Sequence, residues 1–482
     1  MAKVKEKKKI GNMSPLRFWV VVWGMGLAGQ LCWNMENQWF NTFVYAKISQ
    51  DVDIVTWMVI LSAFVTTIST FVFGTMSDRM GNRRKFVSIG YIIWGVATIV
   101  FGLTEYVGNI AGTSVALAGF LVVFTDAIMS FFGSMGNDSG YNVWLNDHTN
   151  DKNKGQVGAA LAALPVIGTV IGTVLGGALV NVGNTTVGTD HYDPSLDNYQ
   201  LLFWFMGIFV IVVGVISLFI MKDHPSVKPV KRGSFWSQVT EIFRFSSLKG
   251  NKNLKELLLA NLVACCFFIP FNFYFTHMGN WIIYDIGFTA GDMGLIQGIA
   301  LLLAVLVTIP FIKLINKNQI PLVTLISVVC NAVGLFLIYA LVKDSNSVDT
   351  TSLFSAKNIP ILLCVFLVGV GYVLITQACM IWVKSLFPEE SKGQFEGLRV
   401  LFFTLIPMLI GTLIGNAIIK NTAQGNAQYD DYGHLIEVPQ ENLFLWAAII
   451  VLFTFIPLIF ASKAYYKRVK ETKVEEAIAD KA

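Results

Sequence analysis

Long apolar runs separated by short polar segments constrain this 482-residue chain more than any other feature. A helix needs about 20 mostly apolar residues to cross a hydrocarbon core roughly 30 Å thick. Backbone polar groups in lipid must be satisfied within the segment, so such runs fold as membrane-spanning helices. Twelve spans are predicted, at residues 16–45, 54–76, 86–104, 114–145, 157–182, 200–221, 257–284, 293–315, 320–342, 358–386, 396–420 and 442–466.

Composition and missing motifs exclude several classes of protein. Hydrophobic residues make up 54% of the chain and charged residues only 14%, against about 25% charge in soluble domains. The six cysteines fall in apolar runs without metal-ligand spacing, so neither disulfides nor a metal site is predicted. No phosphate-binding Gly-x-x-x-x-Gly-Lys loop and no cluster of nucleophile and base occur. We therefore expect no enzyme, no cofactor and no nucleic-acid partner.

The positions of the basic residues predict the topology, because positively charged loops stay in the cytoplasm. An even number of spans puts both termini on one side. Placing them inside leaves 31 of the 35 Lys and Arg residues in cytoplasmic segments. The basic N-terminal segment is interpreted as a retained tail rather than a signal peptide. We expect a multi-pass protein of the cell membrane with both termini cytoplasmic.

The longest inner polar segment divides the chain into two halves. Residues 222–256 contain two prolines and eight basic residues and separate six spans from six. An amphipathic helix at the inner leaflet, with Phe235, Trp236, Val239, Ile242 and Phe243 on one face, and a loosely structured linker are both open interpretations. The expected organisation is a bundle at 1–221, a linker at 222–256, a second bundle at 257–466 and a cytoplasmic tail at 467–482.

An internal repeat relates the two halves. The segment WLNDHTNDKNKGQ begins at Trp144, and WVKSLFPEESKGQ begins 238 residues later at Trp382. A second pair, PVIGTVIG from Pro165 and PMLIGTLIG from Pro407, shares a proline followed by Gly-Thr-x-x-Gly. Repeats of this kind are typical of transporter folds. The predicted fold class is therefore an all-α integral membrane protein of 12 helices in two pseudo-symmetric six-helix bundles.

The inner loop after the second span carries a family signature. The sequence GTMSDRMGNRRK resembles the Gly-x-x-x-Asp-Arg-x-Gly-x-Arg motif of the major facilitator superfamily, with Asn82 where a basic residue is more usual. Glycine permits a tight turn or a close helix contact, and the aspartate can cap a helix or pair with the other half. The residues that the resemblance assigns to gating are Gly74, Asp78, Arg79, Gly81 and Arg83.

Within that superfamily, the chain resembles the glycoside-pentoside-hexuronide:cation symporters, the melibiose-permease-like group. The resemblance rests on GNDSGYNVWLNDHT at the end of the fourth span and KGQFEGLRVLFF at the eleventh. It places Asn137 or Asp138, and Arg399, at positions where the group carries functional polar residues. Sodium-using members carry acidic residues in the second span, and residues 54–76 have none. The resemblance therefore favours a proton over sodium as the coupling ion.

Polar stripes within the apolar runs supply the candidate binding residues. Ionisable side chains are expensive in lipid and mark functional hypotheses, and polar residues recur at helical spacing in the first, fourth, seventh and tenth spans. The predicted substrate-binding residues are Asn34, Glu36, Asn37, Asp126, Asn137, Asp138, Tyr141, His277, Asn280, Trp281 and Gln377; the predicted cation-coupling residues are Glu36, Asp126, Asp138 and Arg399.

Alternatives remain open for single residues. Glu36 can instead bond Asn34 or Gln38, and His277 can be a wall residue. Arg399 needs a counter-charge, for which Asp138 is preferred; Glu396 and Asp147 are rivals.

The expected function is import of a sugar or glycoside by cation symport through alternating access. Aromatic and amide side chains side by side are what recognition of a hydroxylated solute requires. A drug, a peptide or a lipid as cargo is the alternative. A transporter-like sensor is a further one, although the segment after the last span is short for an output domain. The expected partners are a small solute and membrane lipid, with function as a monomer.

Overall fold

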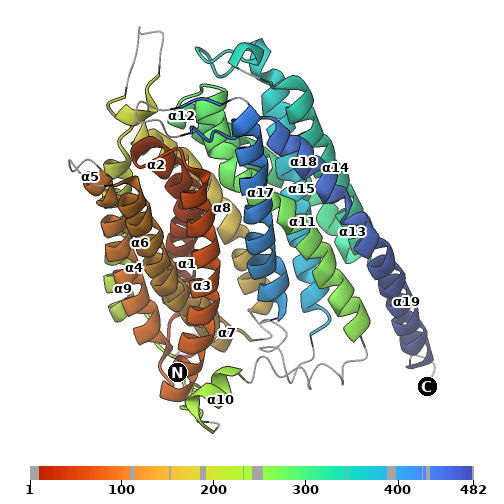
Figure 1. Cartoon of the computed structure of the whole chain (residues 1–482). Coiled ribbons are helices and arrows are strands. Elements are labelled where there is room, and N and C mark those ends of the chain that lie inside the picture. Colours follow the sequence, from red (N-terminus) through yellow and green to blue (C-terminus); the bar gives the residue numbers. More distant parts are fainter. Residues whose placement is uncertain are drawn as a thin grey trace, which may run out of the picture. The chain divides into compact units, whose positions relative to one another are not determined.

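The computed structural model describes residues 10–108, 114–150, 153–184, 192–231, 233–240, 253–343, 345–387, 398–425, 427–429 and 435–479. Within these ranges every regular element is helical, and extended pairing is limited to two isolated bridges (Figure 1). Eleven of the described helices are long and apolar enough to cross a membrane. The predicted first span is helical from Pro15 to Lys47 but is not among the eleven; its outer half carries several amides and a carboxylate.

The chain divides into two compact units, Met1–Thr240 and Glu241–Ala482. The first unit contains six spans in chain order. They are α1 (Pro15–Asn34), η1 (Met35–Trp39) and α2 (Phe40–Lys47); α3 (Val52–Met80); α4 (Arg83–Gly102); α6 (Val115–Gly136), η2 (Asn137–Tyr141) and α7 (Asn142–Asp147); α8 (Lys154–Val180); and α9 (Tyr199–Ile220). Short helices α5 (Thr104–Gly108) and α10 (Phe235–Val239) lie outside these spans.

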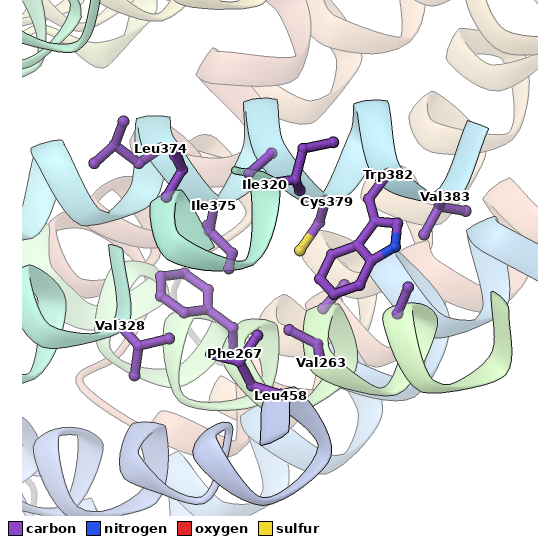
Figure 2. Close-up of a cluster of buried hydrophobic side chains, with 14 of the residues drawn as sticks. Val263, Phe267, Ile320, Val328, Leu374, Ile375, Cys379, Trp382, Val383 and Leu458 are labelled. Carbon is purple, nitrogen blue, oxygen red and sulfur yellow. The ribbon is translucent and has the colours of Figure 1, made fainter. Parts of the chain in front are cut away.

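The second unit repeats the order. Its spans are α11 (Leu254–Asn280) and η6 (Trp281–Asp285); α12 (Ala290–Thr308), η7 (Ile309–Phe311) and α13 (Ile312–Asn316); α14 (Ile320–Leu341); α15 (Ile359–Lys384); η11 (Leu401–Leu405) and α17 (Ile406–Gly425); and α18 (Asn442–Leu452) with α19 (Phe455–Ala479). A buried cluster joins α11, α14, α15 and α19, and Figure 2 shows Phe267, Ile375 and Trp382 within it. Helix α19 continues through the predicted tail as far as Ala479.

The first inner loop explains the departure from the family signature. Gly81 ends α3 in the left-handed region at φ +62°, a conformation that favours glycine. Asn82 then caps α4, because its side chain accepts a hydrogen bond from the Lys85 backbone N–H. In the second unit Asn318 takes φ +59° in the corresponding loop. Both short loops therefore turn through one left-handed residue.

The two repeated tryptophans hold equivalent places in their units. Trp144 and Trp382 are fully buried. The Trp144 indole N–H donates to the Lys222 carbonyl at 2.9 Å, and that of Trp382 donates to Glu256 Oε1 at 2.8 Å. Each indole thus ties the C-terminal part of its unit's fourth span to another span or to the residues that follow one. The repeated Lys-Gly-Gln at 392–394 lies outside the described residues.

Glycines bring the fifth span of each unit against the first. A Cβ placed on Gly168 or Gly172 of α8 would come closer than 3.0 Å to the side chain of Gln30 or Asn34 on α1. In the second unit, a Cβ on Gly415 of α17 would lie 2.5 Å from the Phe273 Cβ on α11. Glycines in the fifth span thus allow it to pack closely against the first.

The described part of the linker packs on the first unit. The short helix α10 contacts α3. Trp236 is 67% exposed whereas Val239 is 7% exposed, so these two side chains do not share a solvent-facing side. Ile242 and Phe243 lie outside the described residues, and the longer amphipathic helix stays a prediction.

Candidate functional site

Three π-helical turns contain six of the eleven predicted substrate-binding residues. Glu36 and Asn37 lie in η1, Asn137, Asp138 and Tyr141 lie in η2, and Trp281 begins η6. A π turn inserts one residue into an α-helix and is often found at functional sites. It changes which side chains share a face, so the turns, rather than simple helical spacing, decide where these residues point.

A chain of four polar side chains, three of them buried and Glu36 half-buried, lies among three helices of the first unit. Ser130 Oγ on α6 lies 2.7 Å from Glu36 Oε1 and 3.0 Å from Ser62 Oγ on α3. Ser62 in turn donates to Asp126 Oδ2. Ser62, Asp126 and Ser130 are at most 4% exposed. The structure therefore brings two of the three predicted coupling carboxyls together through two hydroxyl groups; Ser62 was not predicted.

The two carboxyls of this hydrogen-bonded chain, Glu36 and Asp126, each keep one oxygen without a hydrogen bond. Glu36 Oε2 and Asp126 Oδ1 are buried and have no partner in the part of the chain that the structure describes. None of the ion pairs among the described residues involves either carboxyl. A buried carboxylate left this way carries a large desolvation penalty. The arrangement is suited to binding a proton or another small cation.

The residues of η2 are mostly tied to neighbouring helices. Tyr141 donates to the Val22 carbonyl on α1 at 2.6 Å, and Tyr91 donates to Asn137 Oδ1 at 3.2 Å. Asn137 and Tyr141 are at most 3% exposed, whereas Asp138 is partly exposed. Of the three residues predicted here, Asp138 alone is both ionisable and accessible.

The polar residues that recur at helical spacing in the first span do not form one accessible surface. Asn34 is 6% exposed and donates to Thr173 on α8 at 3.1 Å. Asn37 is exposed and its amide returns to the Trp33 carbonyl, while Asn41 is buried and donates to the Asn37 carbonyl. Asn34 is buried because α8 packs over that side of α1.

In the second unit, three predicted residues cluster near the end of α11. His277, Asn280 and Trp281 are fully buried. Both ring nitrogens of His277 and the indole nitrogen of Trp281 have no hydrogen-bond partner among the described residues. Buried polar groups are normally paired. These unpaired groups are therefore available to a ligand.

Gln377 lies at a different depth along the helices of the second unit from His277. Phe271 on α11 stacks on Tyr372 on α15, with ring centroids 4.7 Å apart. The two helices are antiparallel, since Trp382 near the end of α15 contacts Glu256 near the start of α11. His277 lies six residues outward from that level and Gln377 five residues inward, which separates them by about 16 Å at 1.5 Å per residue. The structure does not bring these two predicted residues together.

The predicted partner of Arg399 is not decided by the structure. Arg399 lies over the Phe403 ring, 5.6 Å from its centroid. Asp138 belongs to the other unit, so their pairing stays a prediction. The rival Asp147 already pairs with Arg83 Nε at 3.1 Å, and Glu396 lies outside the described residues.

The predicted gating residues form a network around the first inner loop. Arg83 pairs with Asp78 at 2.5 Å and donates to Ser77 Oγ at 2.6 Å. Arg79 donates to the Gly233 carbonyl and to Gln238 Oε1 in the linker, at 3.0 and 3.1 Å.

Gly74 does not make the close helix contact that its place in the motif suggested. A Cβ there would meet only Ser139, at 3.9 Å, which is an ordinary contact distance.

The fold and the polar groups buried inside its spans define a multi-pass membrane protein of the transporter type. The model of the Major Facilitator Superfamily matches residues 26–355. The chain belongs to this superfamily. No curated protein sequence matches it.

Solved structures of similar fold carry different cargoes. A nucleoside transporter, NupG, has 11% identity and a TM-score of 0.65 over 92% of this chain and 99% of that one. A D-xylose-proton symporter has 13% identity and a TM-score of 0.63, covering 91% and 97%. A peptide transporter of the POT family has 13% identity and a TM-score of 0.61, covering 94% and 97%. Identity at this level shows the fold alone.

Proposed function

We propose that this transporter imports a sugar or glycoside together with a proton. The observation that carries the proposal is the pair of buried carboxyls, Glu36 and Asp126, linked through Ser130 and Ser62. A carboxyl in a dry site takes up and releases a proton according to its exposure to water. Protonation in one state of alternating access and release in the other couples the ion to the solute.

The chemistry of the second unit supports a neutral, hydroxylated solute. His277, Asn280 and Trp281 offer hydrogen-bonding groups and an aromatic ring without a fixed charge. Sugar hydroxyls bind amide and imidazole groups, and the apolar face of a sugar ring stacks on indole. Nucleosides and D-xylose, named for two proteins of similar fold, both contain a pentose, although likeness of fold is weak support for a substrate. We assign the chain to the glycoside-pentoside-hexuronide:cation group on its sequence resemblance.

The same proposal includes the gate and the topology. We propose that the network of Asp78, Arg79 and Arg83 stabilises one closed state at the cytoplasmic face, with both termini cytoplasmic as the basic residues indicate. Asp138 and Arg399 are the proposed charge pair between the units. We omit Asn34 from the proposed binding residues because its contacts are with α8.

Uptake into proteoliposomes tests the proposal. A panel of labelled pentosides, hexosides and hexuronides is offered under an imposed proton or sodium gradient to the wild type, Glu36→Gln and Asp126→Asn. We expect proton-driven accumulation of one solute in the wild type, and its loss in both variants with solute exchange retained. Glu105→Gln is the matched control, because Glu105 pairs with Lys47 and takes no part in the hydrogen-bonded chain of Glu36 and Asp126.

Two results would contradict parts of the proposal. Proton-driven accumulation that persists in both Glu36→Gln and Asp126→Asn would show that neither carboxyl couples the proton to the solute. Transport of a dipeptide or a lipophilic drug, with no movement of any glycoside, would favour the non-sugar alternative that the peptide transporter fold also permits.

A further inference from the structure

The number of hydrogens in the Glu36–Asp126 chain limits how many protons it can hold. The chain has three links: Glu36 to Ser130, Ser130 to Ser62, and Ser62 to Asp126. Each serine hydroxyl supplies one hydrogen. With both carboxyls ionised, two hydrogens serve three links, and one pair of oxygens faces each other without a hydrogen. One added proton completes all three links.

We propose that this chain binds a single proton that both carboxyls share through the two serines. In one arrangement Glu36 carries the proton and donates to Ser130, Ser130 donates to Ser62, and Ser62 donates to ionised Asp126. In the other, Asp126 carries the proton and every donor and acceptor is reversed. Ser130 and Ser62 are therefore positioning residues that act as a relay between Glu36 on η1 and Asp126 on α6. This inference rests on the proposed function for its role in coupling.

Proton transfer along the chain needs no further reactant. The O–H bond of Glu36 breaks as its proton passes to Ser130 Oγ. The Ser130 hydroxyl proton passes to Ser62 Oγ, and the Ser62 hydroxyl proton passes to Asp126 Oδ2. Three O–H bonds break and three form, and the negative charge moves from Asp126 to Glu36. The carboxyl on the first span and the carboxyl on the fourth thus exchange protonation without water.

Among the described residues, no ion pair offsets the charge of Glu36 or Asp126. The other titratable groups near it are Asp138 on η2 and Cys32, one turn before Glu36 on α1. Basic residues on the neighbouring helices α1, α3 and α4 lie at one end of each helix. Along the first span, Lys47 on α2 is 11 residues from Glu36, about 16 Å, and pairs with Glu105, and Arg17 is 19 residues away, about 28 Å. Two ionised carboxylates here would repel each other in a medium of low dielectric. One shared proton removes that repulsion.

Proton counting and infrared spectroscopy on the purified protein test the relay without any solute. The neutral-carboxyl C=O band and the number of protons released on raising the pH are compared for the wild type, Glu36→Gln and Asp126→Asn. A carboxamide can donate to the adjacent serine as the protonated acid does. We therefore expect either substitution alone to remove one titratable proton per protein molecule. The double substitution should remove that same proton and no other.

Substitutions of the serines test the linkage itself. Ser130→Ala should uncouple the carboxyls. In that background, Glu36→Gln and Asp126→Asn should each remove a different C=O band and a different proton. Ser130→Thr should restore the single shared band. Ser134→Ala is the matched control, because Ser134 lies one turn further along α6 and bonds Thr70 instead. Gel filtration of each variant checks folding.

The outcomes separate this inference from the proposed function. Two protons in the wild type, additive effects of the two carboxamides, or loss of the band on adding sodium at constant pH would overturn the relay, even where proton-coupled uptake is observed. A single shared proton in a protein that moves no glycoside would leave the relay standing and remove the sugar assignment.

Discussion

The contact between α8 and α1 is close enough that one added methyl group should weaken it measurably. A Cβ on Gly168 would come closer than 3.0 Å to the Gln30 Cβ, whereas carbon atoms pack best at about 3.5–4.0 Å. Overpacking of this kind costs about 1–3 kcal/mol. Alanine also raises helix propensity over glycine by up to about 1 kcal/mol, which partly offsets the clash in Gly168→Ala.

A second glycine of α8 isolates the packing term. A Cβ on Gly158 would meet no heavy atom within 4 Å, so Gly158→Ala should only gain helix propensity. The two variants should therefore differ by about 1–3 kcal/mol, the overpacking term alone. Buried cysteines such as Cys32 and Cys379 allow unfolding to be followed with a thiol-reactive fluorophore. A melting temperature of Gly168→Ala at or above that of Gly158→Ala would refute the argument.

Three further predictions concern the inner ends of the spans. Arg468→Gln should destabilise the protein by about 3 kcal/mol in detergent titration, because it leaves Glu256 buried without its counter-charge; Lys467→Gln, at a 78% exposed side chain, should change little. Burial lowers the pKa of His148 below its ordinary value, about 6.5, so stability should fall as the pH drops below that value, and His148→Phe should flatten the melting temperature between pH 7 and 5. Gly81→Ala should lower the melting temperature, because Gly81 has φ +62° and a Cβ there would lie 2.7 Å from a linker backbone nitrogen.

The spans were predictable because hydropathy measures the property that the membrane selects. The predicted segment 54–76 lies inside α3, Val52–Met80, and 114–145 nearly matches the fourth span, Val115–Asp147. The ends differ because helices continue into the polar loops, where local caps decide the boundary. Gly81 and Asn82 set one such boundary through backbone conformation and a side-chain cap. Such caps are short-range signals that the sequence also contains.

The partners of the site residues were less predictable. Ser62 completes the chain to Asp126, yet one serine in an apolar run carries little signal, and the family resemblance draws attention only to acidic residues in the second span. Asn34 was predicted to bind substrate, although the glycines of the fifth span already indicated a close helix contact. Because Gly168 and Gly172 face Gln30 and Asn34, that glycine stripe marks the side of the first span that a neighbour covers.

The π turns explain why helical spacing misplaced the first span's residues. In a regular helix, residues 34 and 41 are seven positions apart and share a face. The turn η1, Met35–Trp39, lies between them and adds about one residue, or roughly 100° of rotation. Asn34, before the turn, contacts α8, and Asn41, after it, is buried with its amide on the Asn37 carbonyl; Glu36, inside the turn, reaches Ser130 on α6. Glu36 thus lies on a π turn at the point where its carboxyl makes the first link of the shared-proton chain.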